Sequence, residues 1–324
     1  MSRGIRSFLV GLSLCAAAST AAAQEKWDMA TAYPESNFHT KNARLFAQDV
    51  ERATDGKLKV TVHGAATLFK ANEIKRAVQG GQAQLGEIVI STYANEDPIF
   101  GIDGLPGLAT SYDEARKLWR VTRPALEARY AKQGMKLLYA VAWPPNGIHS
   151  VRKIDGPAEL KGLKWRAFSP ISARIGEIFG ARPVTVQGVE LSQALATGVV
   201  EAVMTSASTA IDTKMWEYTR FYYEGDWVMV KNAVLVNQKA FDGLPRATQE
   251  ALLKVAAAAE ERGWQMSEDN NRSAKEELGR HNVTITRPPP AFKAEMQRAG
   301  DIILSEWLKQ AGPDGAAVID AYRK

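Results

Sequence analysis

The stretch KLKVTVHGAATLFKANEIKRAVQGGQAQLGEIVIST, residues 57–92, decides the fold class. Residues 57–63 alternate apolar and polar side chains, which is the period of a half-exposed strand. Residues 64–86 contain an amphipathic helix that ends at Gly80-Gly81. Residues 87–92 form a continuous run rich in β-branched side chains, as in a strand buried on both faces. The order strand, helix, strand predicts an α/β domain with a largely parallel sheet.

The same alternation continues on both sides of this stretch. Residues 27–32 are typical of a short strand, and a helix follows from a capping candidate, Ser36 or Thr40, to Gly56. A helix over about 112–132, which Pro124 is expected to kink or break, precedes a strand at 135–143. Residues 174–209 repeat the helix-and-strand pattern, and 221–238 indicate one long β segment that could cross between domains. The pattern contains no internal repeat and no low-complexity linker.

A long helical pattern runs from Pro245 to about Gly279. It exceeds the usual length of a helix in a globular core, so we expect it to bridge two lobes. The chain has 324 residues, of which 45% are hydrophobic and 24% charged. This length and composition suit a globular protein of two domains.

The N-terminus predicts export. Arg3 and Arg6 precede an apolar run, residues 8–18, that is too short to span a bilayer, and Ala21 to Ala23 supply small residues for cleavage. We expect a signal peptide at 1–23, cleaved near Ala23, and a periplasmic location. A membrane anchor is less favoured because these small residues allow cleavage. A lipoprotein is less favoured because the residue before Cys15 is not small. Cys15 is the only cysteine, so the mature chain would have no disulfide and no thiolate.

Charge and motif content exclude several functions. Without Arg3 and Arg6 the chain keeps 39 basic and 36 acidic residues, which alternate along helical stretches and predict a solvated surface, with no binding of DNA or RNA. None of the four histidines has a metal-ligand spacing, and no phosphate-binding loop or nucleophile elbow is present. Glu260 and Glu261 are neighbours on a helix and must diverge, so they form no carboxylate pair. We therefore expect no metal, no cofactor and no catalytic set.

A cation amid aromatic residues stands out at Arg166, which lies between Trp165 and Ala167 in a predicted strand. Side chains alternate along a strand, so Arg166 would face a cleft with Phe168 while Trp165 packs inside. A guanidinium matches a carboxylate through two parallel hydrogen bonds. The alternative is a structural ion pair, and the spacing alone leaves the two about equal. The acids considered for that ion pair are Asp155, Glu159 and Glu201.

Aromatic and histidine side chains also follow several predicted strands, where open α/β sheets bind their ligands. For each of them, taken singly, core packing is the more frequent role. They are Phe38, His39, Tyr93, Trp143, His149 and Trp227.

Several segments resemble the DctP-type extracytoplasmic solute receptors of tripartite ATP-independent periplasmic (TRAP) transporters. ELKGLKWRAF (159–168) is similar to a family signature that ends in a hydrophobic residue and an arginine. LSQALATGVVEA (191–202) is similar to a second segment typical of the family, and residues 235–254 resemble the start of the family's long helix. The resemblance runs from about Trp27 to the last helix, nearly the whole mature chain.

The resemblance implies an α/β, two-lobe periplasmic binding protein, a type II-like clamp with a long bridging helix. Residues 24–145 plus about 232–278 would form lobe I, and 146–231 plus about 279–324 lobe II. Arg166 falls on the family's arginine that binds a substrate carboxylate. The implied partners are a small-molecule carboxylate solute and the TRAP membrane permease subunits.

Departures from the family pattern point to the ligand. Thr205 stands where many relatives have asparagine, His149 where many have arginine, and Gln187-Gly188 where some have a large aromatic residue. Less charge and less bulk favour an organic monocarboxylate, and we expect an aromatic 2-oxo or 2-hydroxy acid or a hydroxycinnamate. The expected ligand-binding residues are Arg166, Phe168, Thr205, Ser206, His149, Trp143, Tyr93, Phe38, His39, Glu73, Gln187, Gly188 and Trp227.

Three alternatives stay open on the sequence. A receptor for a short aliphatic oxo or hydroxy acid, such as pyruvate or lactate, would use the aromatic residues only as core. A periplasmic isomerase or lyase could use the same scaffold, although the chain shows no base–nucleophile pair. A sensory role is also compatible with the sequence.

Overall fold

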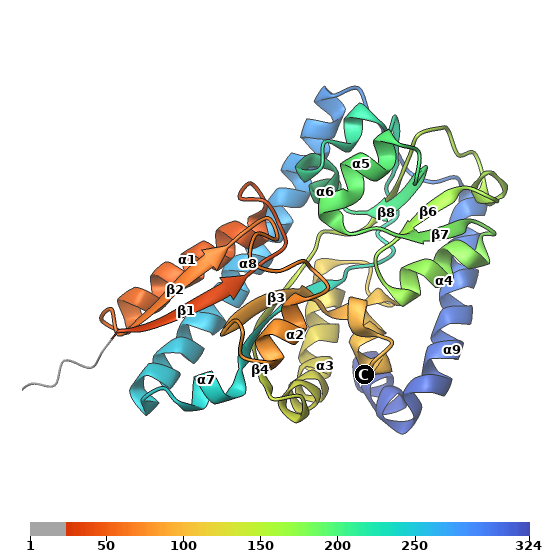
Figure 1. Ribbon diagram of the computed structural model, residues 1–324. Helices are drawn as coiled ribbons and strands as arrows, with labels where there is room; N and C mark the ends of the chain where they lie inside the picture. Colours follow the sequence, from red (N-terminus) through yellow and green to blue (C-terminus); the bar gives the residue numbers. More distant parts are fainter. Residues whose placement is uncertain (1–23) are drawn as a thin grey trace, which may run out of the picture.

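The computed structural model describes residues 24–324, so the predicted signal peptide lies outside the described residues. Two mixed sheets form the two halves of the molecule (Figure 1). In the first sheet β1 runs parallel to both β2 and β3, and β10 runs antiparallel to β3 and β4. Its strands, in spatial order, are β2 (Leu58–His63), β1 (Glu25–Ala30), β3 (Leu85–Val89), β10 (Lys231–Asn237) and β4 (Met135–Ala142).

The second sheet is shorter-stranded. β6 is parallel to β7 and β8, whereas β5 is antiparallel to β8 and β9. In spatial order the strands are β11 (Thr284–Thr286), β9 (Phe221–Tyr223), β5 (Gly147–Ser150), β8 (Ala202–Thr205), β6 (Lys164–Ala167) and β7 (Arg182–Thr185). The α/β fold class is thereby confirmed.

Helices cover both sheets (Figure 1). They are α1 (Phe38–Ala53), α2 (Ile74–Gln79), α3 (Tyr112–Lys132), α4 (Pro170–Ile178), α5 (Leu191–Ala196), α6 (Ala207–Asp212), α7 (Gln238–Asp242), α8 (Arg246–Arg280) and α9 (Pro290–Arg323). The cap of α1 is neither Ser36 nor Thr40: the side chain of Asn37 accepts a hydrogen bond from the backbone N–H of His39. An asparagine serves this position as well as serine does.

Two local expectations were wrong in part: α3 is not broken, and the segment 221–238, which does cross between the sheets, is not one strand. Pro124 does not break α3, which continues through it from Tyr112 to Lys132. The carbonyl that loses its helical donor belongs to Arg120, and that residue is exposed, so water can replace the bond. The segment 221–238 is two strands in different sheets, β9 and β10, because residues 224–230 leave the β conformation and Asp226 adopts a left-handed φ of 49°.

The chain crosses between the two sheets in three places: residues 143–146, residues 224–230 and α8. Helix α8 is 35 residues long and contacts α1 and β4 beside the first sheet, then α6 and β11 beside the second. This agrees with the long bridging helix expected from the sequence.

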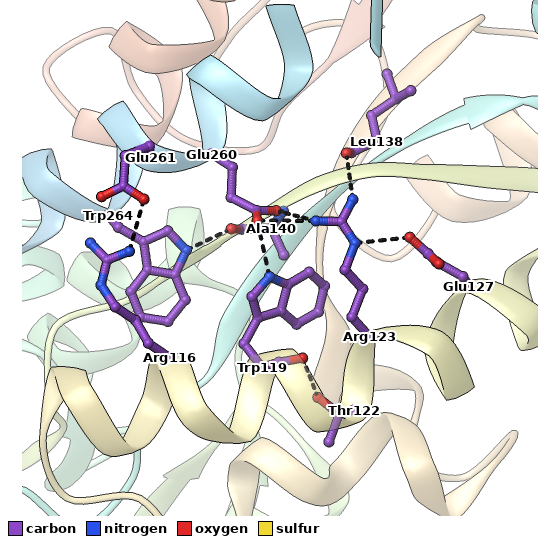
Figure 2. Close-up of polar contacts among 10 residues, drawn as sticks. All are labelled: Arg116, Trp119, Thr122, Arg123, Glu127, Leu138, Ala140, Glu260, Glu261 and Trp264. Carbon is purple, nitrogen blue, oxygen red and sulfur yellow. Dashed lines mark hydrogen bonds and ion pairs between the residues drawn. The ribbon is translucent and has the colours of Figure 1, made fainter. Parts of the chain in front are cut away.

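Helix α8 is fixed to the free edge of β4 by side chains (Figure 2). The Glu260 carboxylate accepts hydrogen bonds from the backbone N–H of Ala140 at 2.9 Å, from Trp119 at 3.1 Å and from Arg123 at 3.1 Å. Trp264 donates to the carbonyl of Ala140 at 2.9 Å. These bonds satisfy backbone groups that an open sheet edge would leave unpaired. Glu261 turns away and pairs with Arg116, so the two glutamates diverge as predicted.

The last helix contacts both halves. Trp307 donates to the carbonyl of Pro98, which lies beside α3, while Glu306 pairs with Arg174 of α4 at 2.8 Å. The helix is bent at Gly312, whose φ is 58°. The proposed lobe boundaries, which assign 279–324 to the second lobe, stay a prediction.

Candidate functional site

A cavity of about 290 Å³ lies between the two sheets. The first half contributes Tyr33 from the loop before α1, Glu87 from β3 and Tyr93 from the short 3₁₀ helix that follows β3. The second half contributes Arg166 from β6 and Thr205 at the end of β8. The cavity therefore sits at the carboxyl ends of strands from both sheets, where open α/β sheets place their ligands.

The β6 strand turns Arg166 into this cavity. Trp165, its neighbour, is fully buried on the other face, and its indole N–H donates to the carbonyl of Ser172 at 2.9 Å. The period of two along a strand then directs Arg166 to the opposite side, into the cavity lining. Phe168, two residues further on, also lines the cavity, and its ring lies 5.1 Å from the Arg166 guanidinium carbon.

The guanidinium of Arg166 makes no ion pair with any carboxylate of residues 24–324. Its Nε donates to the carbonyl of Val186 at 3.0 Å. Arg166 as a whole is only 6% exposed. Burial without a counter-charge lowers the pKa of Arg166 to about 10. The arginine stays protonated at neutral pH and has hydrogen-bond donors left for an anion.

The structural ion pair considered for Arg166 does not form. Asp155 pairs instead with Lys153 at 2.7 Å. Glu201 accepts from the backbone N–H of Lys164 at 3.1 Å. Glu159 forms no ion pair with Arg166 either, so among the described residues the cation is left to the cavity.

Eight of the predicted ligand-binding residues line the cavity and five do not. Those that line it are Tyr93, Trp143, Arg166, Phe168, Gln187, Gly188, Thr205 and Ser206. Those outside the lining are Phe38, His39, Glu73, His149 and Trp227.

Aromatic packing places two of the five in a layer behind the cavity wall. The rings of Phe38 and His39 lie 5.4 and 4.4 Å from the ring of Trp143, which stands between them and the cavity. Trp227 is also buried, and its ring lies 5.5 Å from Phe292 of α9. Phe38 and His39 therefore pack against the wall residue Trp143, and Trp227 packs against α9.

Glu73 and His149 lie outside the cavity lining for opposite reasons. Glu73 is exposed before α2, where its carboxylate accepts from the backbone N–H of Lys70 at 3.2 Å. His149 is fully buried in the second sheet and stacks on Tyr222 with 4.2 Å between ring centroids. Burial lowers the pKa of His149 to about 3, so the imidazole is neutral there.

Glu87 is a cavity residue that the sequence reasoning missed. Its carboxylate is 3% exposed, accepts from the Thr31 hydroxyl at 2.6 Å, and lies 3.1 Å from His39 Nδ1. Burial raises the pKa of Glu87, but His39 and Thr31 outweigh it and hold the pKa below its ordinary value. The only signal in the sequence is an acid within an otherwise apolar strand, L-G-E-I-V.

A second missed acid joins the two halves across the cavity. Asp212, at the end of α6, accepts hydrogen bonds from Asn37 at 2.5 Å and from Ser36 at 3.3 Å, both in the loop before α1. Thr92 donates to the carbonyl of Phe168 at 3.4 Å on another side. These bonds connect the two halves beside the cavity. Burial raises the pKa of Asp212 above its ordinary value.

A cavity between two α/β halves, which crossing segments and one long helix connect, is typical of a receptor for a small solute. Comparison with known proteins gives the family. Residues 29–310 match the model of the bacterial extracellular solute-binding proteins, family 7 (DctP), and the chain belongs to this family. No helix in residues 24–324 is long and apolar enough to cross a membrane.

Solved structures agree with this assignment. DctP6 of Bordetella pertussis, an extracytoplasmic solute receptor binding pyroglutamic acid, is 53% identical, with a TM-score of 0.90 over 92% of this chain and 99% of that one. DctP7 of the same organism, also binding pyroglutamic acid, is 41% identical, with a TM-score of 0.91 over 92% and 99%. The C4-dicarboxylate-binding periplasmic protein DctP of Rhodobacter capsulatus is 26% identical over 72% of this chain and 71% of that protein.

The protein is thus a periplasmic solute receptor of the TRAP type and not an enzyme. This confirms the resemblance seen in the sequence and removes the isomerase or lyase alternative. Receptors of this kind bind small carboxylates and work with membrane permease components.

Proposed function

We propose that this receptor binds pyroglutamate, a five-membered lactam that carries one carboxylate, and delivers it to a TRAP permease. Two relatives at 53% and 41% identity and a marine metagenome receptor at 38% are described as binding this compound. Each aligns with at least 92% of this chain.

The observation that carries the proposal is the unpaired Arg166 guanidinium in an enclosed cavity. A buried cation without a counter-ion is costly, and a ligand carboxylate supplies the missing charge through hydrogen bonds to the two Nη atoms. Because Nε already donates to the carbonyl of Val186, the ligand carboxylate is expected at the two Nη atoms of the guanidinium.

The size and walls of the cavity support a small ring. Its volume of about 290 Å³ lies at the lower limit of the roughly 300–1,000 Å³ typical of ligand pockets. Tyr93, Trp143 and Phe168 offer flat apolar surfaces to the faces of a ring. Asn146 and Thr205 line the same cavity, and they offer polar groups for a ring oxygen.

A second candidate is an aromatic 2-oxo or 2-hydroxy acid or a hydroxycinnamate. The four aromatic side chains of the cavity wall, Tyr33, Tyr93, Trp143 and Phe168, favour such a ligand. The small volume and the relatives that bind pyroglutamate favour the lactam instead. A short aliphatic acid such as pyruvate would fit the arginine but leave the aromatic walls uncovered.

Closure of the two halves over the solute would give the permease one defined form of the receptor. The bonds from Asn37 and Ser36 to Asp212 join the two halves beside the cavity, and they would be lost if the halves moved apart. Solute contacts to both halves shift the population toward closure, and the closed receptor is the form offered to the permease.

The test is a calorimetric titration of the mature chain after unfolding and refolding to remove any co-purified ligand. L-pyroglutamate, mandelate, a hydroxycinnamate and pyruvate would be compared under one buffer, with melting-temperature shifts as a second readout. We expect L-pyroglutamate to bind most tightly. Tighter binding of an aromatic acid, or no heat with pyroglutamate from a refolded protein, refutes the proposal.

A further inference from the structure

Glu87 poses a problem for a cavity that receives an anion. It lines the cavity and is ionised at neutral pH, because its contacts with His39 and Thr31 outweigh the effect of burial. A second carboxylate brought into the same enclosed space would be repelled, and burial strengthens that repulsion. A hydrogen bond from the ligand to Glu87 would offset this cost.

The protein leaves part of the Glu87 carboxylate unused. One oxygen accepts from the Thr31 hydroxyl at 2.6 Å, and the other lies 3.1 Å from His39 Nδ1. An ionised carboxylate has about four acceptor positions on its two oxygens. Asn232 is a third polar neighbour, and it also lowers the pKa of this carboxyl. Three neighbours still leave acceptor capacity, and the side chain borders the cavity, so a ligand donor can reach it.

Position in the fold sets Glu87 opposite Arg166. Glu87 lies on β3 of the first sheet and Arg166 on β6 of the second. Both charges act on the buried Tyr33 hydroxyl, where Glu87 raises the pKa and Arg166 lowers it, after the larger effect of burial. The two charged groups therefore border one cavity from its two halves.

We propose that Glu87 accepts a hydrogen bond from an N–H of the ligand, so that the receptor selects a carboxylate with a donor beside it. The inference rests on the proposed function. In pyroglutamate the carboxylate and the ring N–H are on adjacent ring atoms, so one molecule can meet Arg166 and Glu87 together. A ligand with an acceptor at that place brings two acceptors together and loses affinity.

The matched ligand is the lactone 5-oxotetrahydrofuran-2-carboxylate, which replaces the ring N–H of pyroglutamate with an ether oxygen and keeps the ring size and the carboxylate. Titration of the wild-type chain with both compounds is expected to give a Kd at least about 100-fold higher for the lactone, because sites built around a hydrogen bond reject analogues that lack it. Equal affinities would overturn the inference and leave pyroglutamate as the solute. No binding of either compound would instead remove the proposed function.

Glu87→Gln assigns the effect to this residue. The amide side chain can donate to the lactone oxygen as well as accept from the lactam, so the lactone-to-lactam Kd ratio should fall to about tenfold or less. A ratio that stays at the wild-type value would overturn the role of Glu87. Glu73→Gln is the matched control, since Glu73 is exposed outside the cavity, and it should leave both Kd values unchanged. If Glu87→Gln does not fold, the wild-type ratio alone decides.

Discussion

Replacing Arg166 by alanine should abolish most of the affinity for a carboxylate without unfolding the receptor. The side chain is 6% exposed and has no acidic partner among the described residues, so a bound carboxylate in the variant would be buried with no cation. Truncating one partner of a buried charged pair costs about 2–5 kcal/mol. At about 1.4 kcal/mol per tenfold change, the Kd should rise by roughly 30-fold to several thousandfold.

The stability of the ligand-free fold should change much less. Burial lowers the pKa of Arg166 to about 10, which corresponds to about 3 kcal/mol of unfavourable desolvation that the variant removes. Against this gain, the variant loses the contact with the Phe168 ring, about 0.5–2 kcal/mol, and the bond to Val186, about 1–3 kcal/mol. These effects nearly cancel, so the free energy of unfolding should change by less than about 2 kcal/mol.

The assay is isothermal titration of pyroglutamate into wild type, Arg166→Ala and Arg166→Lys, with urea denaturation of each ligand-free protein. Lysine keeps the positive charge but lacks the planar fork, so its Kd should lie between the other two. A folded alanine variant with wild-type affinity would show that the carboxylate is bound elsewhere and would end this reasoning.

The remaining predictions concern the cavity wall, the hinge helix and pH. Gly188→Phe should weaken binding of bulky acids more than of small ones in titrations, since a Cβ at Gly188 meets no atom within 4 Å and the ring can enter the cavity; equal losses would place Gly188 outside the binding region. Glu260→Ala should lower the free energy of unfolding, measured by urea denaturation, by about 2–4 kcal/mol. The reason is that Trp119, Arg123 and the backbone of β4 lose their acceptor (Figure 2). The control variant Glu261→Ala, on the exposed side of α8, should lower it by less than about 1 kcal/mol. His149 has a pKa of about 3 in the fold against about 6.5 when unfolded, so the unfolded chain takes up the proton first and stability falls as pH drops below about 6.5. From pH 7 to pH 5 this residue should account for about 2 kcal/mol of the loss, and His149→Phe should lose that much less; an identical pH dependence in both proteins would contradict the assignment.

The sequence was enough to predict the elements that hold the site. The period of two along residues 164–168 placed Arg166 on the face opposite Trp165, and the helical pattern after Pro245 predicted α8 to within a residue or two. Thr205 was predicted through the family resemblance, and its place at the carboxyl end of β8 agrees with where open α/β sheets bind ligands.

Residues whose roles depend on tertiary packing were not predictable. His149 lies on β5, a strand covered on both faces, so alternation could not tell which side faces the cavity. Asp212 meets Asn37 across 175 positions of the chain, and no local pattern encodes that approach. Glu87 reads as one polar residue in a buried strand, and its neighbours Thr31 and His39 come from distant segments of the chain.

The placement of the two charges links recognition to closure. Arg166 belongs to the second sheet and Glu87 to the first, so a ligand that binds only the arginine contacts one half of the receptor. A ligand shifts a conformational equilibrium only by its difference in affinity for the two states. In the proposed binding mode, pyroglutamate would gain its second contact on closure, whereas an acid without a donor would gain nothing from closing on Glu87. Selection of the solute and formation of the closed receptor then depend on the same hydrogen bond.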